Sequence, residues 1–309
     1  WNGKPFPTNS RVTALFKDKQ NKLWIGTEKD GLLIYDLSKD EYERYLAPDA
    51  YGFFGRINDL LVDKNGMAWI LTRSQGLATY LLEEDKITFY SKNQEDERGL
   101  SSDLTYSIIE DESGIIWIGG IGGLNKFDKS KTKFQHLYHN ALDPNSLSDN
   151  VVRGLYYDDK NTLWIGTDAG YLNLYHLKSR VNERIKISLP GTSDIIVAFY
   201  FLEYEDKMLV GSSHGVLEYD KQKKSFKRFA TIGEQYTGRA RQLVIYKEEL
   251  YILSQGMIYR FNIKTGEERH PAHYGVRYIG AKRISPTGIF KDLEDNLWIG
   301  FYGGVAKVL

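Results

Sequence analysis

A four-residue phrase, in which an apolar residue precedes Trp-Ile-Gly or a close variant, recurs along this chain at a nearly constant interval. It stands at residues 23–26, 68–71, 116–119, 163–166 and 297–300 and includes five of the six tryptophans. The first four tryptophans are 45, 48 and 47 residues apart, and degraded copies at 208–211 and 250–253 fill the longer interval before Trp298. The sequence therefore contains seven copies of a unit of about 46 residues.

Each copy has the same internal order. An apolar run ends in an aspartate, a short polar turn follows, and the tryptophan phrase begins. Three residues beyond the aspartate stands Asn, Gly or Asp, the types that best tolerate the left-handed backbone of a tight hairpin. A glycine and two further strand-like segments follow the phrase, which predicts four strands per copy. Where tryptophan is present, the aspartate precedes it by six residues: Asp18, Asp63, Asp111, Asp158 and Asp292.

The tryptophan phrase is apolar at consecutive positions, which indicates a strand buried on both faces. Seven four-stranded sheets buried on both faces pack radially against one another. We therefore predict an all-β fold, a seven-bladed β-propeller with four antiparallel strands per blade, formed as one domain by residues 1–309. A linear stack is the alternative, but it would leave two apolar end faces uncapped.

The length leaves the last blade incomplete. Seven units need about 320 residues, about 11 more than the 309 present, and the seventh unit ends with its third strand. We predict that residues 1–4 supply the missing strand and close the ring by pairing with residues 306–309. The alternative is that the chain, which begins at Trp1 rather than Met, is a piece of a longer polypeptide.

Composition excludes several classes of function. The 41 Lys and Arg balance the 41 Asp and Glu, which argues against a nucleic-acid binder held by a general basic field. No stretch approaches the roughly 20 apolar residues of a membrane-spanning helix. Without cysteine there is no disulfide scaffold, thiolate zinc site or cysteine nucleophile. The six histidines show no metal-ligand spacing, and no phosphate loop or nucleophile motif is present. We expect no catalytic residues, metal or cofactor.

Two of the copies resemble a known repeat. Residues 106–119 (YSIIEDESGIIWIG) and 152–167 (VRGLYYDDKNTLWIGT), with the lead-in segments at 99–103 and 145–150, are similar to the two-component regulator propeller repeat. Such repeats occur chiefly in periplasmic sensor regions of bacterial hybrid two-component regulators. There they often stand beside a second propeller, a β-sandwich and a membrane helix.

The resemblance implies a non-enzymatic, periplasmic sensing propeller of an inner-membrane signal-transduction protein. Its expected input is an oligosaccharide from polysaccharide breakdown. Its expected partners are an adjacent propeller or β-sandwich of the same polypeptide and a second copy of the full receptor. The alternatives are a polysaccharide-active lyase or hydrolase and a pure protein–protein interaction propeller.

The candidate ligand site comes from the placement of arginine. Arg11 and Arg56 each stand seven residues before the repeat aspartate, at the entrance to a first strand, and Arg239 lies near a corresponding entrance. The crossings between blades and the loops after the tryptophan phrase share one face, opposite the aspartate turns, so these residues would surround one mouth of the central channel. The candidate ligand-binding residues are Arg11, Arg56, Arg73, Arg153, Arg241, Arg283, His214 and Tyr302.

Guanidinium groups bind carboxylate or sulfate in a bidentate manner, which favours uronic-acid or sulfated sugars. Tyr302, Phe53 or Phe54 would stack on the sugar faces. The alternative is that the arginines are merely solvated or form ion pairs with nearby acids, for which the candidates are Asp59, Asp103, Asp149 and Asp194. His214 then remains an ordinary loop residue.

Overall fold

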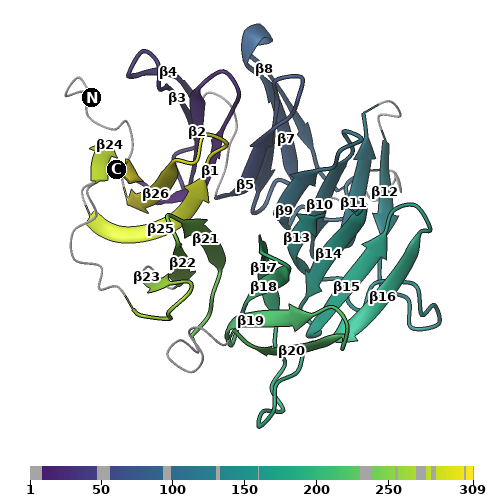
Figure 1. Ribbon diagram of the computed structural model, residues 1–309. Helices are drawn as coiled ribbons and strands as arrows, with labels where there is room; N and C mark the ends of the chain where they lie inside the picture. Colours follow the sequence, from purple (N-terminus) through teal and green to yellow (C-terminus); the bar gives the residue numbers. More distant parts are fainter. Residues whose placement is uncertain are drawn as a thin grey trace.

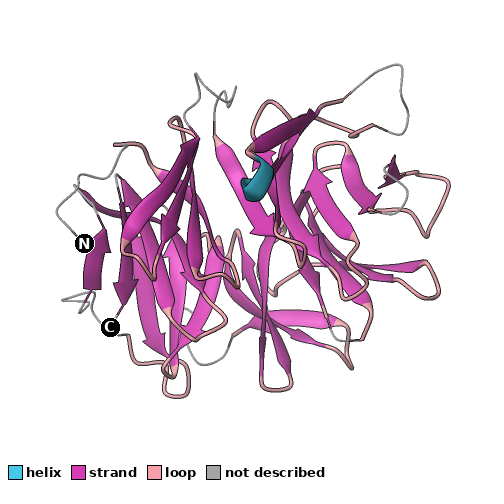
Figure 2. Ribbon diagram, turned by 90° about the horizontal axis from the view of Figure 1, so that it is seen from above, coloured by secondary structure: helices cyan, strands magenta, loops and turns pink. Residues whose placement is uncertain are grey.

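The computed structural model describes residues 9–46, 56–92, 99–129, 133–158, 160–229, 238–254, 257–268, 276–279, 283–302 and 304–308. In these residues the secondary structure is β-strand apart from one short 3-10 turn, η1 (Leu82–Glu84), shown in cyan in Figure 2. The strands form seven sheets arranged around a central axis (Figure 1), so the predicted seven-bladed propeller is confirmed.

The blades follow the chain in order. Blade 1 contains β1 (Val12–Lys17), β2 (Lys22–Thr27), β3 (Leu32–Asp36) and β4 (Glu41–Leu46), and blade 2 contains β5 (Ile57–Val62), β6 (Met67–Thr72), β7 (Leu77–Leu81) and β8 (Lys86–Tyr90). Blade 3 contains β9 (Thr105–Glu110), β10 (Ile116–Gly120), β11 (Gly123–Asp128) and β12 (Lys133–Leu137), and blade 4 contains β13 (Val152–Tyr157), β14 (Thr162–Thr167), β15 (Tyr171–His176) and β16 (Val181–Lys186).

Blade 5 contains β17 (Ala198–Tyr204), β18 (Lys207–Ser212), β19 (Gly215–Asp220) and β20 (Ser225–Arg228). Blade 6 contains β21 (Gln242–Tyr246), β22 (Glu249–Ser254) and β23 (Met257–Asn262), and a single bridge between Phe261 and Glu268 stands beside β23. Blade 7 contains β24 (Val276–Ile279), β25 (Arg283–Lys291), β26 (Leu297–Tyr302) and β27 (Gly304–Val308).

The repeat aspartate joins the first hairpin of a blade to its tryptophan. In each of the five copies, one carboxylate oxygen accepts the backbone N–H groups two and four residues on, and the other accepts the indole N–H at 2.8–2.9 Å. The five tryptophans are at most 4% exposed. A buried carboxylate with all of these donors both shapes the turn and holds the ring in the blade core.

Blades 5 and 6 lack both residues and use a shorter turn. Tyr204 pairs with Lys207, and Tyr246 pairs with Glu249, so only two residues connect the strands of each hairpin. Lys247 and Glu248 both have positive φ, the geometry of the turn that matches strand twist in two-residue hairpins. These blades therefore keep the architecture without the aspartate–tryptophan pair, which is why their sequence signal is weak.

Glycine in the tryptophan phrase sets the spacing between blades. A Cβ on Gly26 would lie 2.6 Å from Cγ2 of Ile57, and one on Gly119 would lie 2.6 Å from Cγ1 of Val152. Each contacted side chain belongs to the first strand of the next blade. The glycine thus lets adjacent blades approach closely.

Ring closure differs from the prediction. Residues 1–4 lie outside the described residues, but the edge of β27 that they were expected to cover pairs with β24 instead, from Val276–Val308 to Ile279–Val305. The prediction that residues 1–4 pair with 306–309 is therefore wrong for 306–308, where β24 occupies that edge. The crossing from blade 6 to blade 7 is long enough to place an extra strand at this edge, which the repeat period does not reveal.

Blade 7 contacts blade 1 by packing. The Thr287 hydroxyl donates a hydrogen bond to the carbonyl of Val12, the rings of Phe16 and Phe290 lie 6.2 Å apart, and Lys17 Nζ lies 2.7 Å from Glu294. The two blades also share a buried cluster that contains Leu23, Trp298 and their neighbours. Among the described residues, side-chain packing and a single backbone bridge between Arg11 and Tyr302 join the two blades, and no sheet spans them.

We predict that Asp111→Ala lowers the free energy of unfolding by about 3 kcal/mol, because it leaves the indole of Trp117 and two backbone N–H groups without an acceptor in a buried site. Urea unfolding measures this loss. The control is Asp220→Ala, which removes an acceptor for the N–H groups of Gln222 and Lys223 at the surface. Equal losses in the two variants would contradict a special role for the buried pair.

One of the repeat aspartates, Asp63, also makes the fold acid-sensitive. Burial alone would raise the pKa of Asp63, but hydrogen bonds from Lys129, Trp69 and the backbone hold it below the usual 3.8. A lowered carboxyl pKa contributes stability that is complete above the unfolded value and is lost as the pH falls through the folded value. We expect the stability difference between wild type and Asp63→Asn to be constant from pH 7 to 5 and to shrink below pH 4. Urea unfolding across this range measures it, and an unchanged difference would refute the assignment.

Candidate functional site

A cavity of about 1310 Å³ runs along the propeller axis and is lined by the first strands of all seven blades. Adjacent first strands run in the same sense, since Thr13 at the start of β1 bonds to the carbonyl of Ile57 at the start of β5, and Asn58 bonds to that of Thr105. Residues that precede these strands therefore gather at one mouth. The repeat aspartates, which follow the strands, lie at the opposite end.

Six arginines line this cavity: Arg11, Arg56, Arg73, Arg153, Arg239 and Arg241. Arg11 and Arg56 immediately precede β1 and β5, as the repeat alignment placed them. Arg73 follows β6, and its backbone N–H bonds to the carbonyl of Arg56 at 2.8 Å, which brings the two residues to the same edge. The structure thus brings five of the eight candidate residues into one cavity, together with Arg239.

These arginines differ in their partners. Arg153 forms a bidentate ion pair with Asp168, with Nε–Oδ1 at 2.7 Å and Nη2–Oδ2 at 2.6 Å, and lies 4.5 Å from the ring centre of Tyr106. In the described part of the chain, no carboxylate forms an ion pair with Arg11, Arg56, Arg73 or Arg241. The Nε atoms of Arg11 and Arg56 are also buried without a hydrogen-bond partner among those residues.

Burial and the crowding of like charges lower the pKa of two of these arginines, Arg56 and Arg241. Burial, and then repulsion from Arg11, lowers the pKa of Arg56, and repulsion from Arg241 and Arg73 adds to this effect while the charge of Glu28 partly opposes it. Burial and repulsion from Arg239, Arg11 and Arg153 lower the pKa of Arg241 in the same way. The guanidinium groups therefore repel one another across the cavity, and a bound anion would relieve this repulsion.

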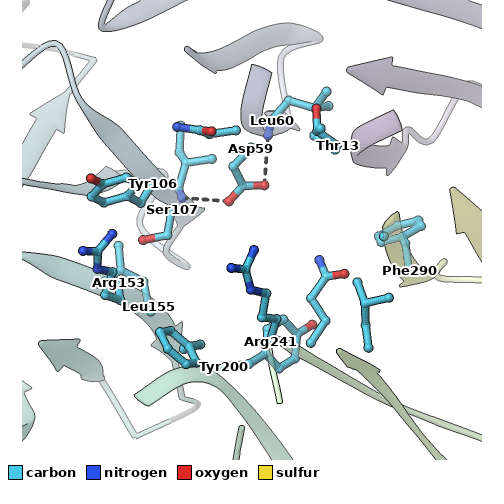
Figure 3. Close-up of a pocket in the computed structure, with 18 of the residues that line it drawn as sticks. Thr13, Asp59, Leu60, Tyr106, Ser107, Arg153, Leu155, Tyr200, Arg241 and Phe290 are labelled. Carbon is cyan, nitrogen blue, oxygen red and sulfur yellow. Dashed lines mark hydrogen bonds between the residues drawn. The ribbon is translucent and has the colours of Figure 1, made fainter. Parts of the chain in front are cut away.

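Three acids line the cavity within the described residues, Asp59, Glu110 and Asp168, and of these only Asp59 has no ion-pair partner there. Asp59 on β5 accepts the N–H of Leu60 at 2.9 Å and that of Ile108, from the neighbouring blade, at 3.1 Å (Figure 3). Burial raises the pKa of Asp59 to about 7, and the two backbone hydrogen bonds only partly offset that effect. Burial and the charge of Asp59 raise the pKa of Tyr200, on the cavity wall of blade 5, to about 12.

Sequence reasoning treated Asp59 only as a candidate arginine partner. The available signal was its position, because a charged residue occupies a first-strand site where neighbouring copies carry Ala14, Ser107 and Gly154. The other proposed acids also bind elsewhere: Asp103 accepts the N–H of Lys92, Asp149 that of Val151, and Asp194 contacts His214. Asp168, which was not among the proposed acids, is the partner of Arg153.

The remaining candidate residues do not line the described cavity. His214 contacts Ser213 and lies 3.1 Å from Asp194, in the loop after β18. Tyr302 lies beside the mouth, with the Arg11 guanidinium 5.9 Å from its ring centre. The backbone of Arg283 pairs with Tyr302 in β25, but its side chain, like Phe53 and Phe54, lies outside the described residues. The ligand-binding role of all eight residues stays a prediction.

No group of three or more His, Asp or Glu side chains in the described ranges has a geometry that could hold a metal ion. No helix in those ranges is both long and apolar enough to cross a membrane.

The sequence model of the family described as two component regulator propeller matches residues 5–29 and 146–169, in the first and fourth copies. Two segments of the chain are thus similar to the two-component regulator propeller repeat. The expected resemblance is thereby confirmed on two of the seven copies. No curated protein sequence matches this chain.

Solved structures with a similar fold include the extracellular domain of a putative hybrid two component system from B. thetaiotaomicron, with a TM-score of 0.74 and 20% identity over 97% of this chain and 40% of that chain. The extracellular domain of a putative one component system from the same organism matches with a TM-score of 0.53 and 20% identity, over 96% and 47% of the two chains. This propeller therefore spans less than half the length of either protein.

An enzyme shares the fold as well. Virginiamycin B lyase from Staphylococcus aureus matches with a TM-score of 0.71 and 14% identity, over 99% of this chain and 97% of that chain. At such identities the likeness concerns the fold alone. The function of this propeller must therefore be argued from its own side chains.

We predict that Arg56→Gln raises the free energy of unfolding by about 1 kcal/mol, because it removes a buried charge that repels its neighbours and has no ion-pair partner among the described residues. Arg153→Gln is the matched control, since it breaks the ion pair with Asp168 and should lower stability. Urea unfolding of both variants measures the contrast. An equal loss in the free energy of unfolding of both variants would show that repulsion among the arginines does not destabilise the fold.

Proposed function

We propose that this propeller is a non-enzymatic, extracytoplasmic ligand-binding module of a two-component signal-transduction protein and that its arginine-lined cavity binds an anionic oligosaccharide. The observation that carries the proposal is the group of four guanidinium groups, on Arg11, Arg56, Arg73 and Arg241, that share one cavity without an ion-pair partner among the described residues. Charged groups brought together in this way reduce stability unless a ligand of opposite charge uses them.

The size and walls of the cavity support a sugar ligand. A volume of about 1310 Å³ is above the usual range of small-molecule sites and accommodates several sugar units. Aromatic side chains of Tyr106, Tyr156 and Phe199 also line it and offer apolar surface for sugar rings. In the complete protein, an adjacent propeller or β-sandwich and a second receptor copy would receive the signal.

The family repeats support the signalling context, and the similar extracellular domains support an extracytoplasmic location. The competing function is a polysaccharide lyase or hydrolase. One observation favours it, namely that a buried acid, Asp59, and a tyrosine, Tyr200, share the cavity in the manner of an acid–base pair. Product analysis separates the two functions.

The test compares sulfated or uronic-acid oligosaccharides with neutral ones of equal length, using calorimetry, thermal shift and analysis of the sugars afterwards. We expect anionic sugars to bind, at least about tenfold weaker affinity in Arg56→Gln, and falling affinity as salt rises. The control Lys186→Gln removes the same charge from the outer strand β16 and should bind as wild type does. Equal binding of neutral sugars would refute the anion site, and new reducing ends or unsaturated products would establish an enzyme.

A further inference from the structure

Asp59 is the one carboxyl group in the middle of the arginine-lined cavity that the proposed function leaves unused. Its two oxygens are held by backbone N–H groups of two different blades, so its position is rigid. In Figure 3 its carboxylate and the guanidinium of Arg241 point toward one another from opposite walls of the cavity. No ion pair joins Asp59 to any described arginine.

Asp59 lines the same cavity as the repelling guanidinium groups, and its carboxylate faces the guanidinium of Arg241. An anion bound between them would repel an ionised carboxylate. Neutralising Asp59 removes this repulsion without a change in the fold, since a carboxylic acid can still accept both backbone hydrogen bonds. A proton from solvent is the only species required.

We propose that anion binding in the arginine-lined cavity is coupled to the uptake of one proton by Asp59, which makes this residue a determinant of affinity that responds to pH. The inference rests on the proposed anion site. The burial of Asp59 supports it, because that burial raises the pKa of the free carboxyl group to about 7, within reach of ordinary conditions.

Other groups around Asp59 do not produce the same behaviour. No histidine lines the cavity in the described residues, and Tyr200, with a pKa of about 12, stays neutral below pH 9. Arginine keeps its charge throughout this range. The charged and titratable side chains that line the cavity with Asp59, within the described residues, are those of Arg11, Arg56, Arg73, Tyr106, Glu110, Arg153, Tyr156, Tyr157, Asp168, Tyr200, Arg239 and Arg241.

The sign of the effect follows from linkage. A bound anion raises the pKa of Asp59 further, so the complex holds more protons than the free protein between the two pKa values. Affinity therefore rises as the pH falls through this window, by up to about tenfold per pH unit, and levels off below the pKa of the free group near 7.

The probe is inorganic sulfate, which does not titrate in this range, with sodium chloride at matched ionic strength as the reference. Titration calorimetry of the whole chain at pH 7.5, in two buffers of different ionisation enthalpy, measures proton uptake directly. We expect uptake of a substantial fraction of one proton and a Kd for sulfate that falls from pH 8.5 to 7. Binding without proton uptake would overturn the proposal while leaving the anion site intact. No sulfate binding at any pH would overturn the anion site itself.

Variants add a second readout. Asp59→Asn should bind sulfate with a Kd that no longer changes between pH 6.5 and 8.5. The matched control Glu110→Gln changes a carboxylate that lies at the far end of β9 and is paired with Lys129, and it should keep the wild-type pH dependence. An unchanged pH profile in Asp59→Asn would overturn the proposal. The number of protons that the wild-type protein takes up on binding sulfate tests the proposal even if Asp59→Asn does not fold.

Discussion

The hydrogen bonds between the repeat aspartate and the tryptophan hold the rest of the propeller in place. One carboxylate orders the turn and orients the indole, so the hairpin and the core of a blade form together. The glycine two residues after the tryptophan then admits the first strand of the next blade. The same short segment thus shapes the turn within a blade and the packing between blades. Its repetition, with the aspartate and tryptophan present in five of the seven blades, curves the chain into a ring.

The ring geometry also creates the arginine-lined cavity. Because all first strands run in the same sense, side chains at equivalent repeat positions meet at one mouth even when they are over 200 residues apart. Arginines that look isolated along the chain become neighbours there, and their charges repel. The net charge of zero conceals this local field, since the repeat aspartates lie at the other end of the strands.

Sequence alone predicted the blade number, the strand order within a blade and the buried tryptophans, because the aspartate-to-tryptophan spacing reports a local structure. It failed at ring closure, where β24 rather than residues 1–4 covers β27. The weak sixth copy lacks the aspartate and tryptophan, so the period could not show that its outer segment is used by blade 7. The alignment of the repeats also predicted that Arg11 and Arg56 lie at the mouth. His214 and Tyr302 are not among the described residues that line the cavity.

The sequence by itself therefore determined the fold and the side of the molecule on which a site would lie, because both follow from residues within a single repeat. Only the tertiary structure decided which arginines have partners. It showed that Arg153 forms an ion pair with Asp168, that Arg11 and Arg56 have no ion-pair partner in the described chain, and that Asp59 lines the same cavity. Charge pairing and desolvation depend on distances between blades, and no pattern along one chain encodes those distances directly.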